Sequence, residues 1–157
     1  MTERTAPRST LSIDVAAPPG LVFQLVRDPS RWPALLPHYS HARRIEAEPG
    51  GVVVIEFVAR RPLIPILGLG MPVAWRSRTW AEPAERRLRF VHRGGATAGM
   101  DVTWRIEATP GGCRILIEHE SGRWLPLYAQ LVERLFVRPI ASRTLATFKA
   151  LAEALGE

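Results

Sequence analysis

The sequence has almost none of the features that mark secreted or membrane-spanning chains. Cys113 is the only cysteine among 157 residues, which excludes an internal disulfide. No apolar run approaches the ~18 residues that cross a bilayer, so we expect no transmembrane segment. The opening residues, MTERTAPRST, contain no apolar signal region. Together these features predict a cytoplasmic protein.

Lysine is scarce as well. Lys149 is the only lysine among 21 basic residues, and the net charge is +6 at pH 7. An excess of arginine permits association with nucleic acid or an anionic surface, but it does not indicate a fold. The chain has no repeat, linker or low-complexity segment, and its length suits one domain. We expect a flexible tail over residues 1–9 and a single domain over 10–157, as a monomer or a homodimer.

The usual signatures of enzymes and metal sites are also missing. There is no Ser-His-Asp pattern, no pair of catalytic carboxylates and no phosphate-binding glycine loop. The histidines have neither cysteine partners nor the helical H-E-x-x-H spacing of zinc enzymes. We therefore expect no metal and no cofactor.

The N-terminal part of the chain predicts one strand and two short helices. LSIDV (11–15) alternates apolar and polar residues, as a half-buried strand does. The Pro18-Pro19 pair can open a helix that Asp28-Pro29 ends. Ser30 can cap a second short helix, and Pro37 ends it.

Residues 41–120 alternate with period two and are interrupted by the turns EPGG, EPAE and TPGG. A tight TPGG turn places Glu107 opposite Arg114 and Trp104 opposite Ile117, which gives an antiparallel sheet one dry and one wet face. Six strands are predicted, at 41–48, 51–61, 72–82, 86–94, 99–109 and 112–120.

The last segment, residues 125–155, carries apolar side chains at helical spacing, and Pro139 should kink it. A curved sheet with one dry face needs a cover, and this helix is long enough to supply it. The sequence thus predicts an α+β helix-grip fold. Its parts are a seven-stranded curved antiparallel sheet, two short helices and a long C-terminal helix across the concave face.

Three stretches resemble a known superfamily: APPGLVFQLVRDPSRWPALLP, AGMDVTWRIEATPGGCRI and RPIASRTLATFKALAE. The chain resembles, over nearly its whole length, the START-like (Bet v 1-like, SRPBCC) superfamily and in particular its bacterial polyketide cyclase/dehydrase branch. The resemblance implies that a hydrophobic or aromatic small molecule (polyketide-, lipid- or quinone-like) binds between the sheet and the helix. It is weak evidence for any one reaction, since members of one fold act on different ligands.

Strand direction indicates where such a cavity opens. Successive antiparallel strands reverse, so the three proline turns share one end of the sheet and the longer connections share the other. We call this second end the mouth. One lip is RWPALLPHYSH (31–41), with Trp32 and Leu36 under the sheet edge and Tyr39 and the histidines toward the entrance. The other lip, 62–70, is either a strand extension packed on the core or an apolar gate.

The inward-facing positions are mostly apolar or aromatic, with a few polar groups among them, as in small-molecule sites. Imidazoles titrate near neutral pH, so Tyr39, His92 and His119 are the candidates for moving protons in a cyclisation or dehydration. The candidate ligand-binding residues are Trp32, Leu36, Phe57, Trp75, Ser77, Thr79, Phe90, Trp104, Ile117, Tyr128, Val132 and Phe136.

The resemblance to aromatic polyketide cyclases extends to single residues. Those enzymes carry a Trp-Pro pair followed by a tyrosine that is proposed to line the pocket, and Trp32, Pro33 and Tyr39 match these positions. They also use an arginine in mid-sheet as a hydrogen-bond donor, and that position is Thr79 here. Arg78 beside it should face outward. Without a cationic donor an enolate is harder to stabilise, which weighs against cyclisation.

The alternative function is a macromolecular interaction module. The LLP motif (35–37) resembles the coenzyme Q-binding and ribosome-association toxin branch of the superfamily. The outer sheet face is rich in arginine, diluted at one edge by Glu107, Glu118 and Glu120, and an exposed Trp80 on it could stack an RNA base. The arginines of this face are Arg76, Arg78, Arg87, Arg89, Arg93, Arg105 and Arg114.

Overall fold

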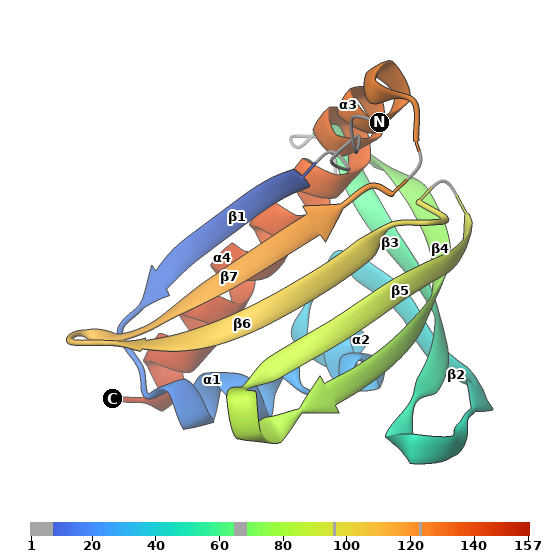
Figure 1. Ribbon diagram of the computed structural model, residues 1–157. Helices are drawn as coiled ribbons and strands as arrows, with labels where there is room; N and C mark the ends of the chain where they lie inside the picture. The colour runs from blue at the N-terminus through green and yellow to red at the C-terminus, as the bar shows by residue number, and fades with distance from the viewer. Residues whose placement is uncertain (1–7, 65–68, 96, 123) are drawn as a thin grey trace, which may run out of the picture.

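The computed structural model describes residues 8–64, 69–95, 97–122 and 124–157. Its seven strands form one antiparallel sheet in the order β1-β7-β6-β5-β4-β3-β2 (Figure 1). The first strand therefore pairs with the last, and the other strands follow as a meander. The strands are β1 (Arg8–Val15), β2 (Tyr39–Ala47), β3 (Val53–Ile64), β4 (Leu69–Glu82), β5 (Arg87–Gly95), β6 (Asp101–Thr109) and β7 (Gly112–Glu120).

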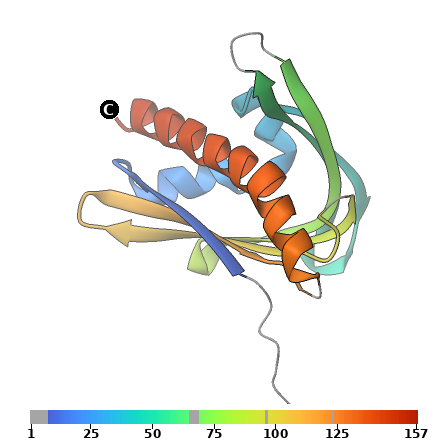
Figure 2. The ribbon, with the colours of Figure 1, turned by 90° about the horizontal axis from the view of Figure 1, so that it is seen from above.

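The sheet curves around one continuous helical segment that lies across its concave face (Figure 2). This segment consists of α3 (Pro126–Val132), a π-helical stretch called η5 (Glu133–Val137) and α4 (Arg138–Leu155). The helix α1 (Pro19–Val26), the 3₁₀ turn η1 (Pro29–Arg31) and α2 (Trp32–Leu35) connect β1 to β2. The predicted α+β helix-grip fold is confirmed.

The register of the β6–β7 hairpin agrees with the prediction from alternation. Trp104 lies opposite Ile117 and Glu107 lies opposite Arg114. The side chains of Trp104 and Ile117 are buried, whereas those of Glu107 and Arg114 lie on the outer face. A shift by one residue would turn both pairs over, so the hydrophobic pattern determines this register.

Several strand ends differ from the prediction. β1 begins at Arg8, so residues 8 and 9 of the expected tail belong to the sheet, while 1–7 lie outside the described residues. β3 continues to Ile64 and β4 begins at Leu69, so part of the predicted 62–70 lip is a strand extension. The remainder of that lip, 65–68, lies outside the described residues.

The turn before α2 is capped by a different residue from the one predicted. Asp28, not Ser30, is the capping residue, because its carboxylate accepts from both the backbone N–H (3.2 Å) and the hydroxyl (2.6 Å) of Ser30. Arg44 on β2 donates to the same Asp28 oxygen at 3.1 Å. An aspartate before proline is a good cap since its carboxylate reaches the N–H two residues on.

The irregularity in the terminal helix lies just before Pro139, as π-helix rather than as a simple kink. Pro139 has no N–H to donate to the carbonyl of Leu135, and its ring crowds that carbonyl. Widening the helix over η5 relieves this clash and shifts the face that each following residue presents. In the described ranges no helix combines the length and the apolar character needed to cross a membrane.

Candidate ligand cavity

A cavity of about 70 Å³ lies between the concave face of the sheet and the η5–α4 helix, toward the mouth. Strands β2 to β7 supply its walls and the helix supplies its cover. Its lining is apolar and aromatic apart from the hydroxyls of Tyr39, Thr97 and Thr144 and two imidazoles. It is lined by Trp32, Tyr39, Phe57, Val73, Trp75, Phe90, His92, Thr97, Met100, Val102, Trp104, Ile117, His119, Phe136, Val137, Ile140, Ala141 and Thr144.

Trp32 is the centre of the aromatic cluster beneath this cavity. Its ring lies 5.4 Å from Tyr39, 5.8 Å from Phe90 and 5.2 Å from Trp104, between ring centroids. Its indole N–H donates to the carbonyl of Val26 at 3.1 Å, which anchors α2 to the end of α1. The short helix therefore delivers Trp32 as a fixed apolar floor, with its one polar group already satisfied.

Trp75 forms a flat aromatic wall. It stacks on Phe57 at 5.2 Å with an interplanar angle of 16°, and on the imidazole of His92 at 6.0 Å with an angle of 2°. Trp75 is only partly buried, whereas Phe57 is fully buried. Parallel rings at the partly exposed side of a cavity offer a surface on which a planar ligand can stack.

Tyr39 is tied to the covering helix through Thr144. The Thr144 hydroxyl donates to the carbonyl of Ile140 at 2.8 Å, so it must accept from His38 Nε2, also at 2.8 Å. The same hydroxyl is the hydrogen-bond partner of Tyr39, whose pKa burial raises above its usual value. Tyr39 therefore stays a neutral phenol at the wall of the cavity.

His38 is neutral for a related reason. Burial, followed by the nearby charge of Arg143, lowers the pKa of His38 to about 4. With its proton on Nε2, its Nδ1 is an acceptor that is buried without a partner. The predicted lip thus packs inward through His38, and it is Tyr39 that reaches the cavity.

His92 and His119 bring two further imidazoles to the cavity wall. Thr97, in the β5–β6 connection, lies 2.6 Å from His92 Nδ1, and two backbone hydrogen bonds close this connection over His92. Burial, then the neighbouring His119, lowers the pKa of His92 to about 3. Burial also lowers the pKa of His119 to about 4, with Arg138 lowering it further and Glu133 opposing the shift. Both rings are therefore uncharged at neutral pH.

Uncharged imidazoles change what the site can do chemically. Each ring offers one N–H donor and one nitrogen acceptor. Among the described residues His119 Nδ1 is fully buried and lacks a hydrogen-bond partner. Among the described residues the lining contains no arginine, lysine or carboxylate, so the cavity favours a neutral ligand with hydroxyl or carbonyl groups.

The structure brings together ten of the candidate residues from the sequence and places five elsewhere. Tyr39, His92 and His119 line the cavity with Trp32, Phe57, Trp75, Phe90, Trp104, Ile117 and Phe136. Leu36, Ser77, Thr79 and Val132 are buried but do not reach it. The expected inward orientation of Tyr128 is wrong, because its side chain is 44% exposed and packs against Trp124.

Several lining residues were absent from the sequence-based candidates. Val73, Met100 and Val102 lie on the inner face of strands already predicted, so period two alone could have found them. Val137, Ile140, Ala141 and Thr144 follow helical spacing along one side of η5 and α4. Thr97 gave no signal, since it lies in a connection whose course only the folded chain reveals.

His41 was expected at the mouth but lies on the outer face. Its Nε2 is 3.5 Å from Glu56, which also pairs with Arg76. A register irregularity between Tyr39 and His41 breaks the alternation of β2 at this point. The bulge therefore sends Tyr39 inward and His41 outward, although residues two positions apart lie on the same face of a regular strand.

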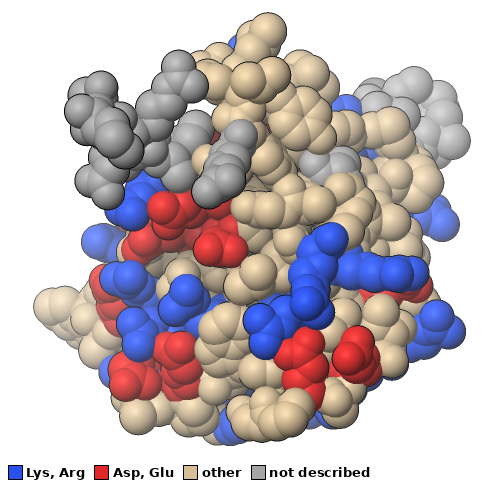
Figure 3. All heavy atoms as spheres, turned by 45° about the vertical axis from the view of Figure 1, so that its right-hand side comes forward, with Lys and Arg blue, Asp and Glu red and all other residues tan. Residues whose placement is uncertain are grey.

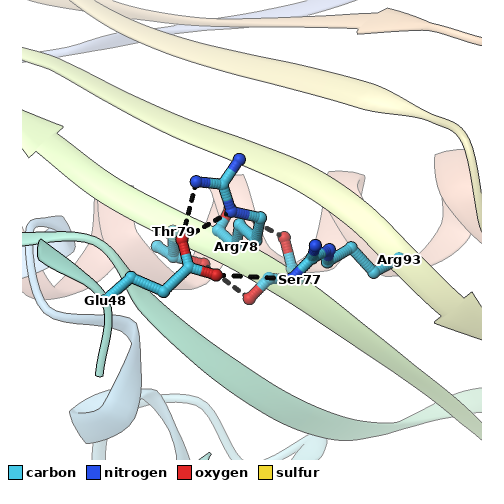
Figure 4. Close-up of polar contacts among 5 residues, drawn as sticks. All are labelled: Glu48, Ser77, Arg78, Thr79 and Arg93. Atoms are coloured by element: carbon cyan, nitrogen blue, oxygen red, sulfur yellow. Dashed lines mark hydrogen bonds and ion pairs between the residues drawn. The ribbon is translucent and has the colours of Figure 1, made fainter. Parts of the chain in front are cut away.

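The arginines of the outer face are paired with carboxylates, as the mixed blue and red surface in Figure 3 illustrates. Glu48 accepts from Arg78 at 2.6 Å and lies 3.3 Å from Arg93 (Figure 4). The remaining predicted arginines have acidic neighbours within 3.9 Å: Arg76 with Glu56, Arg87 and Arg89 with Glu82, Arg105 with Glu118, and Arg114 with Asp14.

Trp80 on this face is half-buried rather than exposed. The Arg89 guanidinium lies 5.6 Å from its ring centroid, and its indole N–H donates to Glu82 at 3.2 Å. A base would have to displace Arg89 to stack there. The pairing of each arginine and the cover over Trp80 do not favour phosphate and base contacts on this face.

Comparison with known proteins agrees with this fold. Solved structures with the same architecture include the ZhuI aromatase/cyclase from Streptomyces sp. R1128, at TM-score 0.73 and 18% identity over 94% of this chain and 93% of that one. A START superfamily protein from Mycobacterium smegmatis matches at TM-score 0.70 and 13% identity, over 94% and 98% of the two chains. The 18 kDa protein CC1736 from Caulobacter crescentus matches at TM-score 0.63 and 20% identity, over 95% of this chain and 97% of that one. These likenesses show the fold alone.

The helix-grip fold of this chain is thus the fold of these solved structures, one of which is described as a START superfamily protein. Residues 6–153 match the family model described as polyketide cyclase/dehydrase and lipid transport, and the chain belongs to that family. No curated protein matched the sequence.

Proposed function

We propose that this protein binds a neutral, hydroxylated aromatic small molecule of the polyketide type in the cavity under α4. The observation that carries the proposal is the lining itself. Flat aromatic walls from Trp75 and Phe57 meet a few uncharged polar groups, among them the imidazoles of His92 and His119. An apolar site with sparse polar groups suits a ligand with a hydrophobic body and a few oxygens.

The cavity is too small to hold such a ligand without rearrangement. Its volume of about 70 Å³ has room for a few water molecules, whereas sites for drug-sized ligands measure roughly 300–1,000 Å³. Phe136 and Val137 lie in the π-helical stretch, where the helix departs from regular hydrogen bonding. We propose that η5 moves outward to admit the ligand, because the sheet wall is held by continuous strand pairing.

Binding is better supported than turnover. In a cyclisation with dehydration, a base removes a proton next to a carbonyl and the resulting carbanion forms a carbon–carbon bond to a second carbonyl. A donor protonates the oxygen of that second carbonyl, which leaves as water when a second proton is lost. In such a reaction Tyr39 would be the donor and His119 the base. However, imidazoles with a pKa of about 3 to 4 are weak bases, and Thr79 occupies the place of the cyclase arginine. Any catalysis by these groups is therefore expected to be slow.

A thermal-shift titration with a hydroxylated anthraquinone, a naphthol and palmitate tests the proposal. The aromatic ligands should stabilise the protein by about 2.7 kcal/mol at a hundredfold excess over the dissociation constant, and palmitate should not. Ala141→Phe fills the cavity from α4 and should abolish the stabilisation. Ala146→Leu, at an exposed position of the same helix, is the control. Native mass spectrometry of protein from its own host would identify a co-purifying ligand.

Two results would refute the proposal. If Ala141→Phe retains the full thermal shift while its own fold is intact, the ligand binds outside the cavity. If palmitate stabilises the protein and the aromatic compounds do not, the ligand class is wrong.

A further inference from the structure

The exposed large apolar side chains of this protein are concentrated in one short segment. Among the described residues seven such side chains are exposed, and five of them lie between 125 and 135. The other two, Ile45 and Leu155, are far from this segment in sequence. We name the five the α3 patch: Leu125 (75% exposed), Leu127 (79%), Tyr128 (44%), Leu131 (53%) and Leu135 (38%).

The sequence of this segment explains why it has a second apolar side. Ala129 and Val132 are buried and hold the segment against the rest of the protein. Leu127 and Leu131, four residues apart, form an outward stripe that folding does not bury. A surface helix normally has a polar outer face, and an apolar one indicates a contact beyond the folded chain.

The charge that borders the α3 patch is positive. Arg134 is exposed within one turn of Leu131, whereas Arg138 is paired with Glu133 at 3.0 Å. The one acidic residue of this segment, Glu133, is directed away from the patch. It accepts from the Ser9 hydroxyl of β1 at 2.8 Å and from Arg138 at 3.0 Å. An apolar stripe bordered by arginine is typical of helices that lie in the interface of an anionic membrane.

The position of α3 suits contact with a flat surface. Figure 1 shows α3 at the mouth end of the molecule, beyond the sheet, and Figure 2 shows it at the end of the helical segment away from the C-terminus. Trp124 packs against Tyr128, and its indole N–H donates to the carbonyl of Ala98 at 2.7 Å. This bond anchors the beginning of α3 to the β5–β6 connection. An aromatic pair beside leucines matches the composition of a membrane–water boundary.

We propose that the α3 patch docks this protein on an anionic lipid surface, with α3 lying in the plane of the interface. A second copy of the chain fits less well. A stable protein interface needs about 800 Å² from each partner. A helical segment of eleven residues is about 16 Å long and about 10 Å wide, so one face of it presents only roughly 200 Å². The cavity lining begins at Phe136, directly after the patch, so docking would bring the cavity mouth to the lipid surface.

This inference is independent of the proposed function, since lipid binding by the patch does not require the cavity. The test is flotation of the full chain with phosphatidylcholine vesicles, with and without phosphatidylglycerol. We expect binding to the anionic vesicles that weakens at high salt. The double substitution Leu127→Ser and Leu131→Ser should reduce binding about tenfold or more. Arg134→Gln should reduce it about fivefold on anionic vesicles alone.

Leu155→Ser is the matched control. Leu155 is 62% exposed at the far end of α4, so its loss should leave flotation unchanged. A melting curve for each variant checks that the fold is intact. The proposal is overturned if wild-type protein does not float with anionic vesicles, or if the serine pair floats like wild type. It is also overturned if sedimentation shows a dimer that the serine pair dissociates, because the patch would then bind a second copy.

Discussion

His38 Nε2 and Thr144 Oγ1 lie 2.8 Å apart and join the segment before β2 to the covering helix across 106 residues of sequence. Because Tyr39 shares the same threonine, one hydroxyl positions both the tyrosine and the helix above it. Thr144 is thus a positioning residue for the polar corner of the cavity.

Replacing Thr144 by valine should destabilise the protein by about 1–3 kcal/mol, because it leaves buried polar groups of His38 and Tyr39 without a partner. Thr144→Ser keeps the hydroxyl and should retain most of the stability. Urea unfolding of the two variants measures the difference. Equal losses for valine and serine would show that the methyl group, not the hydrogen bonds, matters.

Acid should destabilise this protein below pH 6.5. His38, His92 and His119 have a folded pKa of about 4, 3 and 4, below the unfolded value of 6.5. The unfolded chain therefore takes up protons first, and stability falls as the pH drops from 6.5 toward 4, flattening near the folded values. Each ring contributes about 1 kcal/mol per pH unit.

Urea unfolding between pH 6.5 and 5 tests this slope, because carboxylates titrate little in that window. His92→Asn should reduce the slope by about a third, although it also lowers the stability at pH 7. A stability that is constant from pH 6.5 to 5 would contradict the neutral, buried state of these imidazoles.

The Glu48 ion pairs on the outer face should contribute little to stability. Glu48→Gln removes the carboxylate charge that pairs with both Arg78 and Arg93. The side chains of these arginines are 35% and 55% exposed. We expect a small loss of stability that disappears at high salt. Trp32→Ala, by contrast, should cost about 3–5 kcal/mol because it empties the centre of the aromatic cluster. Similar losses for the two variants in the same unfolding assay would refute this ranking.

Gly95 should not tolerate a side chain. Its φ is +88°, and a Cβ there would lie 2.3 Å from the carbonyl oxygen of Ala74 on β4. Gly95→Ala is expected to cost about 1–3 kcal/mol through backbone strain and displacement of β4. Gly111→Ala is the control, since nothing lies within 4 Å of its Cβ position. Melting temperatures of the two variants compare them directly, and an unchanged Gly95→Ala protein would contradict the strain.

Period two and the turn residues were enough to predict the sheet, down to the pairing of Glu107 with Arg114. The same alternation predicted that His92 and Trp104 face the cavity side. It failed where the period itself is broken. The bulge in β2 turns His41 outward, and Tyr128 faces solvent on the helix that covers the sheet. Such irregularities change which face a residue presents without leaving a clear mark in composition.

The order of elements, the dry face of the sheet and the aromatic character of the interior could be predicted without coordinates, because each follows from the local spacing of apolar residues. The folded chain was needed to show that Thr144 meets His38 and Tyr39, that the imidazoles are uncharged, and that the α3 patch faces outward. These features depend on burial and on contacts between residues far apart in the chain, and both arise only when the helix packs across the sheet.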